Sequence, residues 1–330
     1  MLIALVGLCS AGPAVSEECL YAAFENEFSK RTSVFGIWIL GTSQTPTSKI
    51  SHAAHVMAQY LDNDEDGFAD DPAVLERMQS RNATLVMFAN NQQAESTHVF
   101  ENLEENIHIQ DLYGSETHPG YPQSNDQFDA ALEEVLHLIT SAGWSLEYPA
   151  AFGEDPGSLL TDAMDTARGG RYQEWSEDDC DGGGQCALPP GGSYSPSAWY
   201  TYDDDTCSYR CMATEYFYWA LTSMLGAQAG SDRLDEIEQE WALNTEAKVA
   251  SQDPAVYEVL TSRGYALPSQ LPDGNYTGGT VGNLGGDPCS DPEPVPEAPA
   301  SWGLLTLLVG LFGFSAARRF QADHSKGDPA

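Results

Sequence analysis

The amino-acid sequence predicts an α+β fold, in which a small N-terminal sheet is followed by a helix-rich half. Short apolar runs rich in β-branched and aromatic residues predict strands at 33–41 and 84–88, and a further strand at 107–113. The strands are concentrated in the first third of the chain, whereas strict alternation of strand and helix would indicate a doubly wound parallel sheet. Apolar residues at helical spacing predict the following helices: 50–61, 91–103, 126–142, 158–167, 211–228, 233–243 and 254–262.

The composition excludes several classes of protein. The 330 residues include 50 Asp and Glu but only 14 Lys and Arg, which gives a formal net charge of −36. Such a chain repels a polyphosphate, so no nucleic-acid partner is expected. A hydrophobic content of 42% is too high for a disordered acidic chain. The sequence therefore predicts a folded protein with an acidic surface, suited to a medium rich in salt or divalent cations.

The two ends of the chain predict export. Residues 1–16 combine a short apolar run with the small residues that a signal peptidase recognises, and a single globular domain is expected over 17–271. A linker rich in proline, glycine and acidic residues is expected over 272–300. It leads to an apolar membrane helix (301–319) that ends at an arginine pair and precedes a short tail (320–330).

The C-terminal region resembles the PEP-CTERM sorting signal of exported bacterial proteins. The resemblance is carried by the Pro292-Glu293-Pro294 motif, the apolar helix and the Arg318-Arg319 pair. The family implies processing by a membrane transpeptidase (an exosortase) and delivery to the cell envelope or the extracellular matrix. A plain membrane anchor at 301–319 is the alternative, and it also leaves the body of the protein outside the cell.

Cysteine usage agrees with an oxidising compartment. Cys9 lies within the predicted signal, and an even number of cysteines remains in the exported chain. No histidine lies near the closely spaced cysteines, so we expect disulfides rather than metal ligands, with the pairing left open. The cysteines concerned are Cys19, Cys180, Cys186, Cys207, Cys211 and Cys289.

A short acidic segment, 62–71, predicts a calcium-binding loop. Asp62, Asp64 and Asp66 occupy the first, third and fifth positions of a D-x-D-x-D-G pattern, and Gly67 lets the chain turn sharply beneath them. Closely spaced aspartates repel one another without a cation, and calcium binds about six to eight oxygens. Because the twelfth position lacks a glutamate, further oxygens are expected from nearby acidic residues: Asp70, Asp71 or Glu76. The segment resembles the abbreviated EF-hand-like loops of dockerins, and a solvated acidic turn is the alternative.

The helix predicted at 126–142 carries candidate catalytic residues. Glu133, Glu134 and His137 lie side by side next to its apolar face, because residues three and four apart are neighbours on a helix. The segment E-E-x-x-H resembles the H-E-x-x-H helix of zincin metallopeptidases, with glutamate in place of the first histidine. The resemblance implies that Glu133 and His137 bind zinc and that Glu134 is the general base. A glutamate at the first position implies a harder, less zinc-selective site.

Zincins take a third ligand from a helix further along the chain. The helix predicted at 211–228 is apolar almost all round, and Glu215 is its only ionisable carboxylate. Burial of a carboxylate is costly unless it is paired or bound to a metal. Glu215 is therefore the preferred third ligand, with Asp162 and Asp165 as rivals.

A non-catalytic explanation of the same residues is also open. In that case Glu133 and Glu134 form a solvated helix face, His137 bonds to Glu134, and Glu215 pairs with an arginine such as Arg210.

Two functions of different class follow from these observations. The first is an exported, membrane-tethered, calcium-binding metallohydrolase that cleaves a peptide or a polysaccharide. The second is a non-catalytic, calcium-stabilised envelope or matrix protein, to which the tyrosine-rich loop 200–209 could add carbohydrate binding.

His52 and His55 are a weaker candidate pair for a transition metal. The sequence contains no G-x-S-x-G, P-loop or dinucleotide fingerprint, which argues against serine-hydrolase and nucleotide chemistry.

Overall fold

The structure is a computed structural model. It describes residues 20–24, 26–97, 107–124, 126–172, 187–279, 281–282, 284–285 and 289. The chain divides into a unit Met1–Val295, which holds all of these residues, and a second unit, Pro296–Ala330. The predicted signal 1–16, membrane helix 301–319 and tail 320–330 lie outside the described residues. None of the helices in the described ranges is both long and apolar enough to span a membrane.

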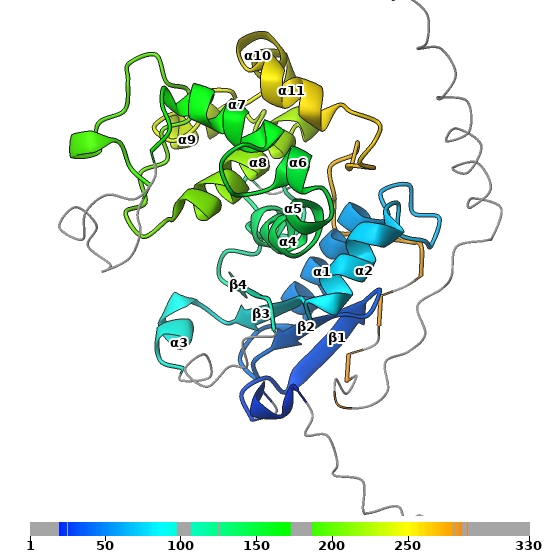
Figure 1. Ribbon diagram of the computed structural model, residues 1–330. Coiled ribbons are helices and arrows are strands. Elements are labelled where there is room, and N and C mark those ends of the chain that lie inside the picture. Colours follow the sequence, from blue (N-terminus) through cyan, green and yellow to red (C-terminus); the bar gives the residue numbers. More distant parts are fainter. Residues whose placement is uncertain are drawn as a thin grey trace, which may run out of the picture. The chain divides into compact units, whose positions relative to one another are not determined.

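The fold is α+β, as predicted, with a small N-terminal four-stranded sheet followed by a helix-rich region (Figure 1). The strands lie in chain order across the sheet. The first two are antiparallel, and the second, third and fourth are parallel to one another. The predicted strand at 84–88 is confirmed, and the strand predicted at 107–113 is confirmed over residues 109–113. The strands are β1 (Lys30–Val34), β2 (Ile37–Gly41), β3 (Thr84–Phe88) and β4 (Ile109–Tyr113).

The predicted single strand at 33–41 is wrong in its middle, where the chain turns back on itself. Phe35 and Gly36 have φ values of 49° and 81°, which is typical of a two-residue hairpin turn. Val34 therefore pairs with Ile37 across the hairpin. The turn was hidden in an unbroken apolar run because a bulky phenylalanine occupies a position where asparagine, aspartate or glycine is usual.

The sheet separates two apolar clusters. Leu85 on β3 faces the larger cluster, which includes the helices α1 (Thr47–Leu61) and α4 (Ala131–Ile139). Val86 faces a smaller cluster formed with aromatic residues from the N-terminal end of the described chain, because successive side chains of a strand point to opposite faces. Helices α1 and α4 contact each other, α1 contacts β1, and α4 contacts β3 and β4, so that α4 is held directly against the sheet.

Helix α4 packs on its other side against α8 (Tyr209–Leu225). Ser208 caps the start of α8 by accepting a hydrogen bond from the Cys211 amide, and Gly226 ends it with a left-handed φ of 89°. A disulfide between Cys207 and Cys211 spans the first turn of α8. Cys289 is also disulfide-bonded, and Cys19, Cys180 and Cys186 lie outside the described residues.

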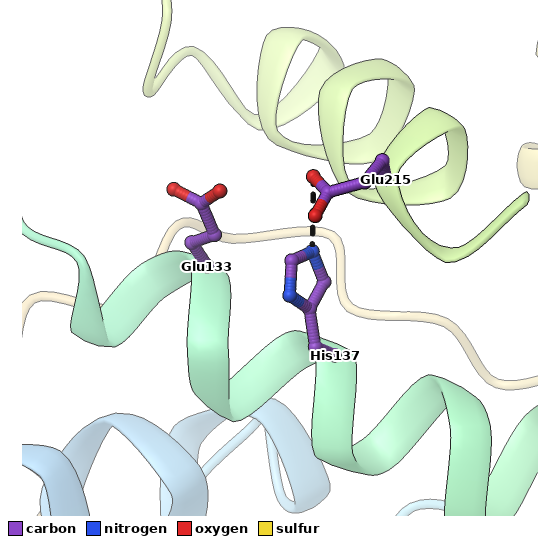
Figure 2. Close-up of side chains that lie close together, drawn as sticks. All are labelled: Glu133, His137 and Glu215. Carbon is purple, nitrogen blue, oxygen red and sulfur yellow. Dashed lines mark ion pairs between the residues drawn. The ribbon is translucent and has the colours of Figure 1, made fainter. Parts of the chain in front are cut away.

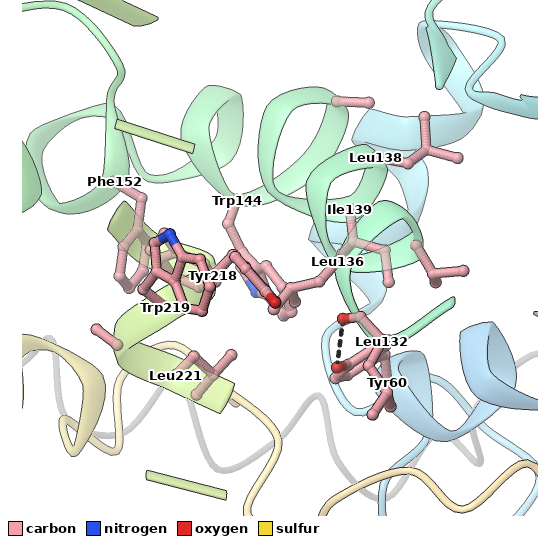
Figure 3. Packing of buried hydrophobic residues seen from close by; sticks show 14 of the residues in the cluster. Tyr60, Leu132, Leu136, Leu138, Ile139, Trp144, Phe152, Tyr218, Trp219 and Leu221 are labelled. Carbon is pink, nitrogen blue, oxygen red and sulfur yellow. Dashed lines mark hydrogen bonds between the residues drawn. The ribbon is translucent and has the colours of Figure 1, made fainter. Parts of the chain in front are cut away.

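The core between these helices is rich in aromatic side chains (Figure 3). Tyr60 on α1 donates a hydrogen bond of 2.8 Å to the carbonyl of Leu132 at the start of α4. Trp144 lies beyond the end of α4, in the π-helical turn η3 (Thr140–Trp144), and packs against Phe217 of α8 with ring centroids 5.7 Å apart. The helix predicted at 126–142 therefore starts later, at residue 131, and changes its hydrogen-bonding pattern at residue 140.

The remaining helices are mostly short. The helix predicted at 233–243 is shorter than expected. Helix α3 covers the start of the helix predicted at 91–103, and residues 98–103 of that prediction lie outside the described part of the chain. Helices α2, α6 and α10 were not predicted because they span few residues with little apolar periodicity. These elements are α2 (Pro72–Ser80), α3 (Asn91–Glu95), α5 (Ser145–Glu147), α6 (Pro149–Phe152), α7 (Leu159–Arg168), α9 (Arg233–Ile237), α10 (Glu246–Gln252), α11 (Pro254–Leu260), and the 3₁₀ turns η1 (Ala22–Phe24) and η4 (Pro190–Gly192).

A C-terminal strap, residues 269–279 and 281–282, packs against the body of the protein. Val281 forms an isolated bridge with Val34, and the Gly282 amide donates to the Ser33 carbonyl at 2.7 Å. The strap thus covers part of the outer edge of β1, whose backbone groups would otherwise lack partners in the sheet. The first residues of the predicted linker 272–300 therefore contact the body of the protein.

Candidate metal centre

Three of the residues predicted as metal ligands come together between α4 and α8 (Figure 2). Glu133, His137 and Glu215 each offer a ligand atom, and these atoms lie within 4.8 Å of one another. The Nε2 atom of His137 lies 3.4 Å from a carboxylate oxygen of Glu215. His137 is only 6% exposed and Glu215 only 9%. The cluster is therefore a polar centre inside a largely apolar helix interface.

The local structure of each helix explains this convergence. On α4, Leu132 and Leu136 are buried in the core, while Glu133 and His137 stand one turn apart on the neighbouring side. On α8, Glu215 lies in the second turn after the capped N-terminus. Because α8 contacts α4 along this side, the carboxylate of Glu215 points towards the imidazole of His137 (Figure 2).

Two buried atoms of the cluster are unsatisfied. Within the described residues, neither His137 Nε2 nor Glu215 Oε2 has a hydrogen-bond partner, although they lie 3.4 Å apart. Native proteins satisfy most buried polar atoms, since leaving one without a partner costs about 1–3 kcal/mol. Both atoms are of the kinds that coordinate divalent metals, so the donor set fits a bound ion.

The charges in the cluster are strongly coupled. Burial raises the pKa of Glu133 to about 8, with further contributions from Glu215 and Glu134. Burial lowers the pKa of His137, but the neighbouring carboxylates of Glu215 and Glu134 outweigh this effect and raise it well above its usual range. The centre therefore concentrates negative charge that either protons or a cation must neutralise.

Glu134 contacts the other ring nitrogen of His137. One oxygen of Glu134 lies 3.3 Å from His137 Nδ1 and accepts a hydrogen bond of 2.6 Å from Gln110 Nε2 on β4. A carboxylate at Nδ1 is the common arrangement that fixes the orientation of a metal-binding histidine. Sequence reasoning missed Gln110, whose polar side chain within a predicted strand was the only signal.

The rival ligands lie in surface ion pairs instead. Asp162 and Asp165 bind Arg171, with nitrogen–oxygen distances of 3.2 and 2.5 Å. Arg210 pairs with Asp155 at 2.7 Å, so the alternative in which Arg210 neutralises the glutamate of the site is wrong.

The two weaker candidates, the pair His52 and His55 and the tyrosine-rich loop, gain no support from the described residues. His52 Nε2 lies 2.6 Å from a carboxylate oxygen of the buried Asp129, and neither His52 nor His55 belongs to a metal-ligand cluster of the described residues. In the tyrosine-rich loop, Tyr200 is fully buried and donates a hydrogen bond of 2.8 Å to the Met212 carbonyl. That ring is therefore inaccessible to a sugar.

The acidic loop forms a second cluster. Ligand atoms of Asp62, Asp64 and Asp70 lie within 4.8 Å of one another. Asp66 is outside this group and accepts a hydrogen bond from the Phe68 amide at 2.9 Å. Burial raises the pKa of Asp70 to about 6, and repulsion from the other loop aspartates adds to this shift. The alternative ligand Asp71 caps the start of α2.

The same loop holds the strap. The side chain of Asn63 accepts hydrogen bonds from the Ser269 and Gln270 amides at 2.8 and 2.9 Å. Glu65 accepts from the Thr277 amide at 2.9 Å, and the Tyr276 hydroxyl donates to Asp62. These contacts were not predictable from the sequence, because they join polar residues that are far apart along the chain.

No known protein family, curated protein or solved structure matches this chain.

Proposed function

We propose that this protein is a metal-dependent hydrolase, in which Glu133, His137 and Glu215 hold one divalent transition-metal ion such as zinc. The observation that carries the proposal is the pair of buried atoms, His137 Nε2 and Glu215 Oε2, which lack a hydrogen-bond partner in the described part of the chain and lie beside Glu133. One imidazole and two carboxylates suit zinc, and also manganese or ferrous iron. Such an ion, when bound, lowers the pKa of a water molecule and polarises a carbonyl group, which is the chemistry of amide hydrolysis.

Two roles for Glu134 follow from its position. The resemblance to zincins assigns it as the general base. Its contact with His137 Nδ1 favours an orienting role, in which the carboxylate keeps Nε2 directed at the ion. The variant Glu134→Gln separates the two roles, because a glutamine can still accept a hydrogen bond from Nδ1–H but cannot take up a proton. If Glu134→Gln keeps its metal but loses hydrolysis, Glu134 is the general base. If Glu134→Gln still hydrolyses substrate and Glu134→Leu loses its metal, Glu134 orients His137.

Metal content of the purified, folded protein tests the proposal directly. We expect one equivalent of a transition metal in the wild type and its loss in His137→Ala. The matched control is His118→Ala, because His118 lies outside the candidate centre in the described structure and its substitution should leave the metal in place. A wild type without bound transition metal after loading with zinc, or a His137→Ala variant that binds zinc as tightly as the wild type, would refute the proposal.

The substrate class is proposed to be a peptide, with a polysaccharide as the alternative. The support is the zincin-like order of residues on α4, together with the third carboxylate from α8. Cleavage of a mixed peptide library by the zinc-loaded protein, compared with Glu215→Gln, checks this assignment. Cleavage that persists in Glu215→Gln would indicate a contaminating protease.

We also propose that the loop 62–71 binds calcium as a structural ion and that the protein is exported and held at the envelope. The clustering of Asp62, Asp64 and Asp70 and the raised pKa of Asp70 support the calcium site. The disulfide between Cys207 and Cys211 supports an oxidising compartment. The sorting machinery and the membrane are the partners expected at the C-terminal end.

A non-catalytic, calcium-stabilised scaffold is the second candidate function. It is favoured by the ion pairs of His137, whose Nδ1 and Nε2 lie 3.3 and 3.4 Å from carboxylate oxygens of Glu134 and Glu215. A protonated imidazole would neutralise part of the cluster without a metal. The metal analysis distinguishes the candidates, because the scaffold requires calcium alone.

A further inference from the structure

We propose that a cavity between α5, α6 and α8 binds an alkylammonium group, such as a lysine side chain, and that Glu154 is its counter-ion. The cavity has a volume of about 340 Å³ and is open to solvent. It is lined by residues of α5 and α6, by the turn at 153–158 and by Arg210 of α8. The inference is independent of the proposed function, because none of the three proposed metal ligands lines this cavity.

Glu154 brings an uncompensated carboxylate to the cavity. It is half-buried, and the Thr214 hydroxyl donates a hydrogen bond to its Oε1 atom at 3.1 Å. Arg210 is engaged elsewhere, because its Nε and Nη2 atoms donate to the two carboxylate oxygens of Asp155 at 2.9 and 2.7 Å. Among the residues that the structure describes, no Lys, Arg or His forms an ion pair with Glu154. Burial raises the pKa of Glu154 to about 7, so a cation in the cavity would stabilise the ionised carboxylate.

The other groups of the cavity suit a hydrogen-bond donor with an apolar body. Ser145 adds a hydroxyl oxygen that can accept a hydrogen bond, since its proton is donated to the Ser141 carbonyl at 3.0 Å. Leu146 is 43% exposed and lines the same cavity as Pro149. An ammonium group carries donors only, and the carbon chain of an alkyl amine covers apolar surface while its charged end stays at polar groups.

The chemistry of the cavity argues against other classes of ligand. An anion would be repelled by Glu154 and by the net charge of −36. Glu154 belongs to neither of the described groups of acidic and histidine side chains that could hold a metal ion, so a divalent cation would lack ligands here. A guanidinium group binds best to both oxygens of a carboxylate, but Oε1 of Glu154 already bonds to Thr214. A compact ammonium group therefore fits this carboxylate best.

Titration with Nα-acetyl-lysine amide tests the proposal. The experiment is done at about pH 8, where Glu154 is mostly ionised and alkyl amines remain protonated. We expect the methyl NMR resonances of Leu146 and Thr214 to shift on binding. Glu154→Gln should weaken binding by roughly 10- to 100-fold, because it removes the charge but keeps the shape of the side chain. The neutral ligand, in which the side-chain amine is also acetylated, should not bind.

The matched control is Glu246→Gln. Glu246 also lines a cavity that is open to solvent, with a volume of about 380 Å³, but it is exposed rather than half-buried. Both variants remove one negative charge, so they reduce the general attraction of the acidic surface for cations by a similar amount. Only Glu154→Gln should lose affinity. Equal weakening in both variants, or no shift of the Leu146 and Thr214 methyl resonances in the wild type, would overturn the inference.

Two further ligands define the class and the source of the group. Nα-acetyl-arginine amide should bind more weakly than the lysine ligand, and equal or tighter binding would overturn the assignment to an ammonium group. n-Pentylamine carries the same charged group without peptide groups. If it binds as tightly as the lysine ligand, the site accepts a free amine. If it binds more weakly, the site recognises a lysine side chain within a peptide. Both results support the ammonium site and distinguish its two sources.

Discussion

His137 is the residue on which the two candidate functions diverge. Its ring lies between two carboxylates, one at each nitrogen. Among the described residues, the carboxylate at Nδ1 is fixed by a further hydrogen bond, from Gln110 to Glu134, and the one at Nε2 is not. In a purely structural ion pair, we would expect Nε2 to donate a well-directed hydrogen bond to the carboxylate of Glu215. Nε2 lies 3.4 Å from Glu215 without a well-directed hydrogen bond among the described residues, and the proposed ion rests on this feature.

Zinc binding should depend on pH because the ligands hold protons in the metal-free protein. The pKa of Glu133 is raised to about 8 and that of His137 is raised well above its usual range, whereas a metal binds the deprotonated forms. We therefore expect zinc affinity to increase as the pH rises from about 6 to about 8. Calorimetry in buffers of different ionisation enthalpy should show proton release on binding. Affinity that is independent of pH would contradict this assignment of protons.

Glu154, which is not one of the proposed ligands, provides a test of stability. Burial raises its pKa to about 7, although Thr214 donates a hydrogen bond to its carboxylate at 3.1 Å. Since the folded state then binds the proton more tightly than the unfolded chain, this residue makes stability fall as the pH rises through the interval from its ordinary pKa to about 7.

The substitution Glu154→Gln removes this ionisation. We expect it to raise the free energy of unfolding by about 1–3 kcal/mol at pH 8 and to have little effect at pH 4, where both states are protonated. Urea unfolding at the two pH values measures the difference. A similar effect at both pH values would show that ionisation of Glu154 does not destabilise the folded state.

At the scale of the elements, the acidic loop joins α1 to α2 and also fastens the strap. Asn63 and Glu65 bind the strap through backbone amides, while Asp62 accepts a hydrogen bond from Tyr276. A cation in the loop would therefore stabilise both the connection between α1 and α2 and the strap that lies over the edge of β1.

Removal of one loop carboxylate should affect stability only when calcium is present. Asp64 is exposed and lies in the cluster with Asp62 and Asp70, so Asp64→Ala removes a calcium ligand without disturbing the core. We expect a lower Tm than that of the wild type in calcium, and a Tm close to that of the wild type in chelator, where the loss of a repelling charge offsets any other change. Equal shifts in both conditions would exclude the calcium site. Glu258→Ala, on the exposed side of α11, is the matched control, because it removes one exposed carboxylate outside the acidic loop and should leave the calcium effect intact.

At the scale of the whole molecule, the net charge of −36 dominates the electrostatics. Self-repulsion of this size destabilises the compact state, and salt screens it over a Debye length of about 10 Å at 0.1 M.

Salt should therefore stabilise the protein through screening. With divalent cations chelated, we expect the Tm to rise by several degrees between low salt and about 0.5 M potassium chloride, where the Debye length is roughly halved. Sucrose at matched osmolality is the control, because it does not screen charge. A Tm that does not respond to potassium chloride would show that the acidic residues are already neutralised, by protons or by bound ions.

The sequence by itself determined the features that depend on neighbours along the chain. The α+β order, strands 84–88 and 107–113, the side-by-side placement of Glu133, Glu134 and His137 and the acidic loop all follow from local spacing. It missed the hairpin turn at Phe35, because that residue lacks the turn chemistry on which prediction relies.

Only the tertiary structure decided which distant residues meet. It brings Glu215 to His137, sends Arg210 to Asp155 instead, and binds the strap to the acidic loop. Helical and strand periodicity fix which side of an element a residue occupies, but not which element that side contacts. The latter depends on how the apolar faces of α1, α4 and α8 pack together, a choice made by the whole core at once.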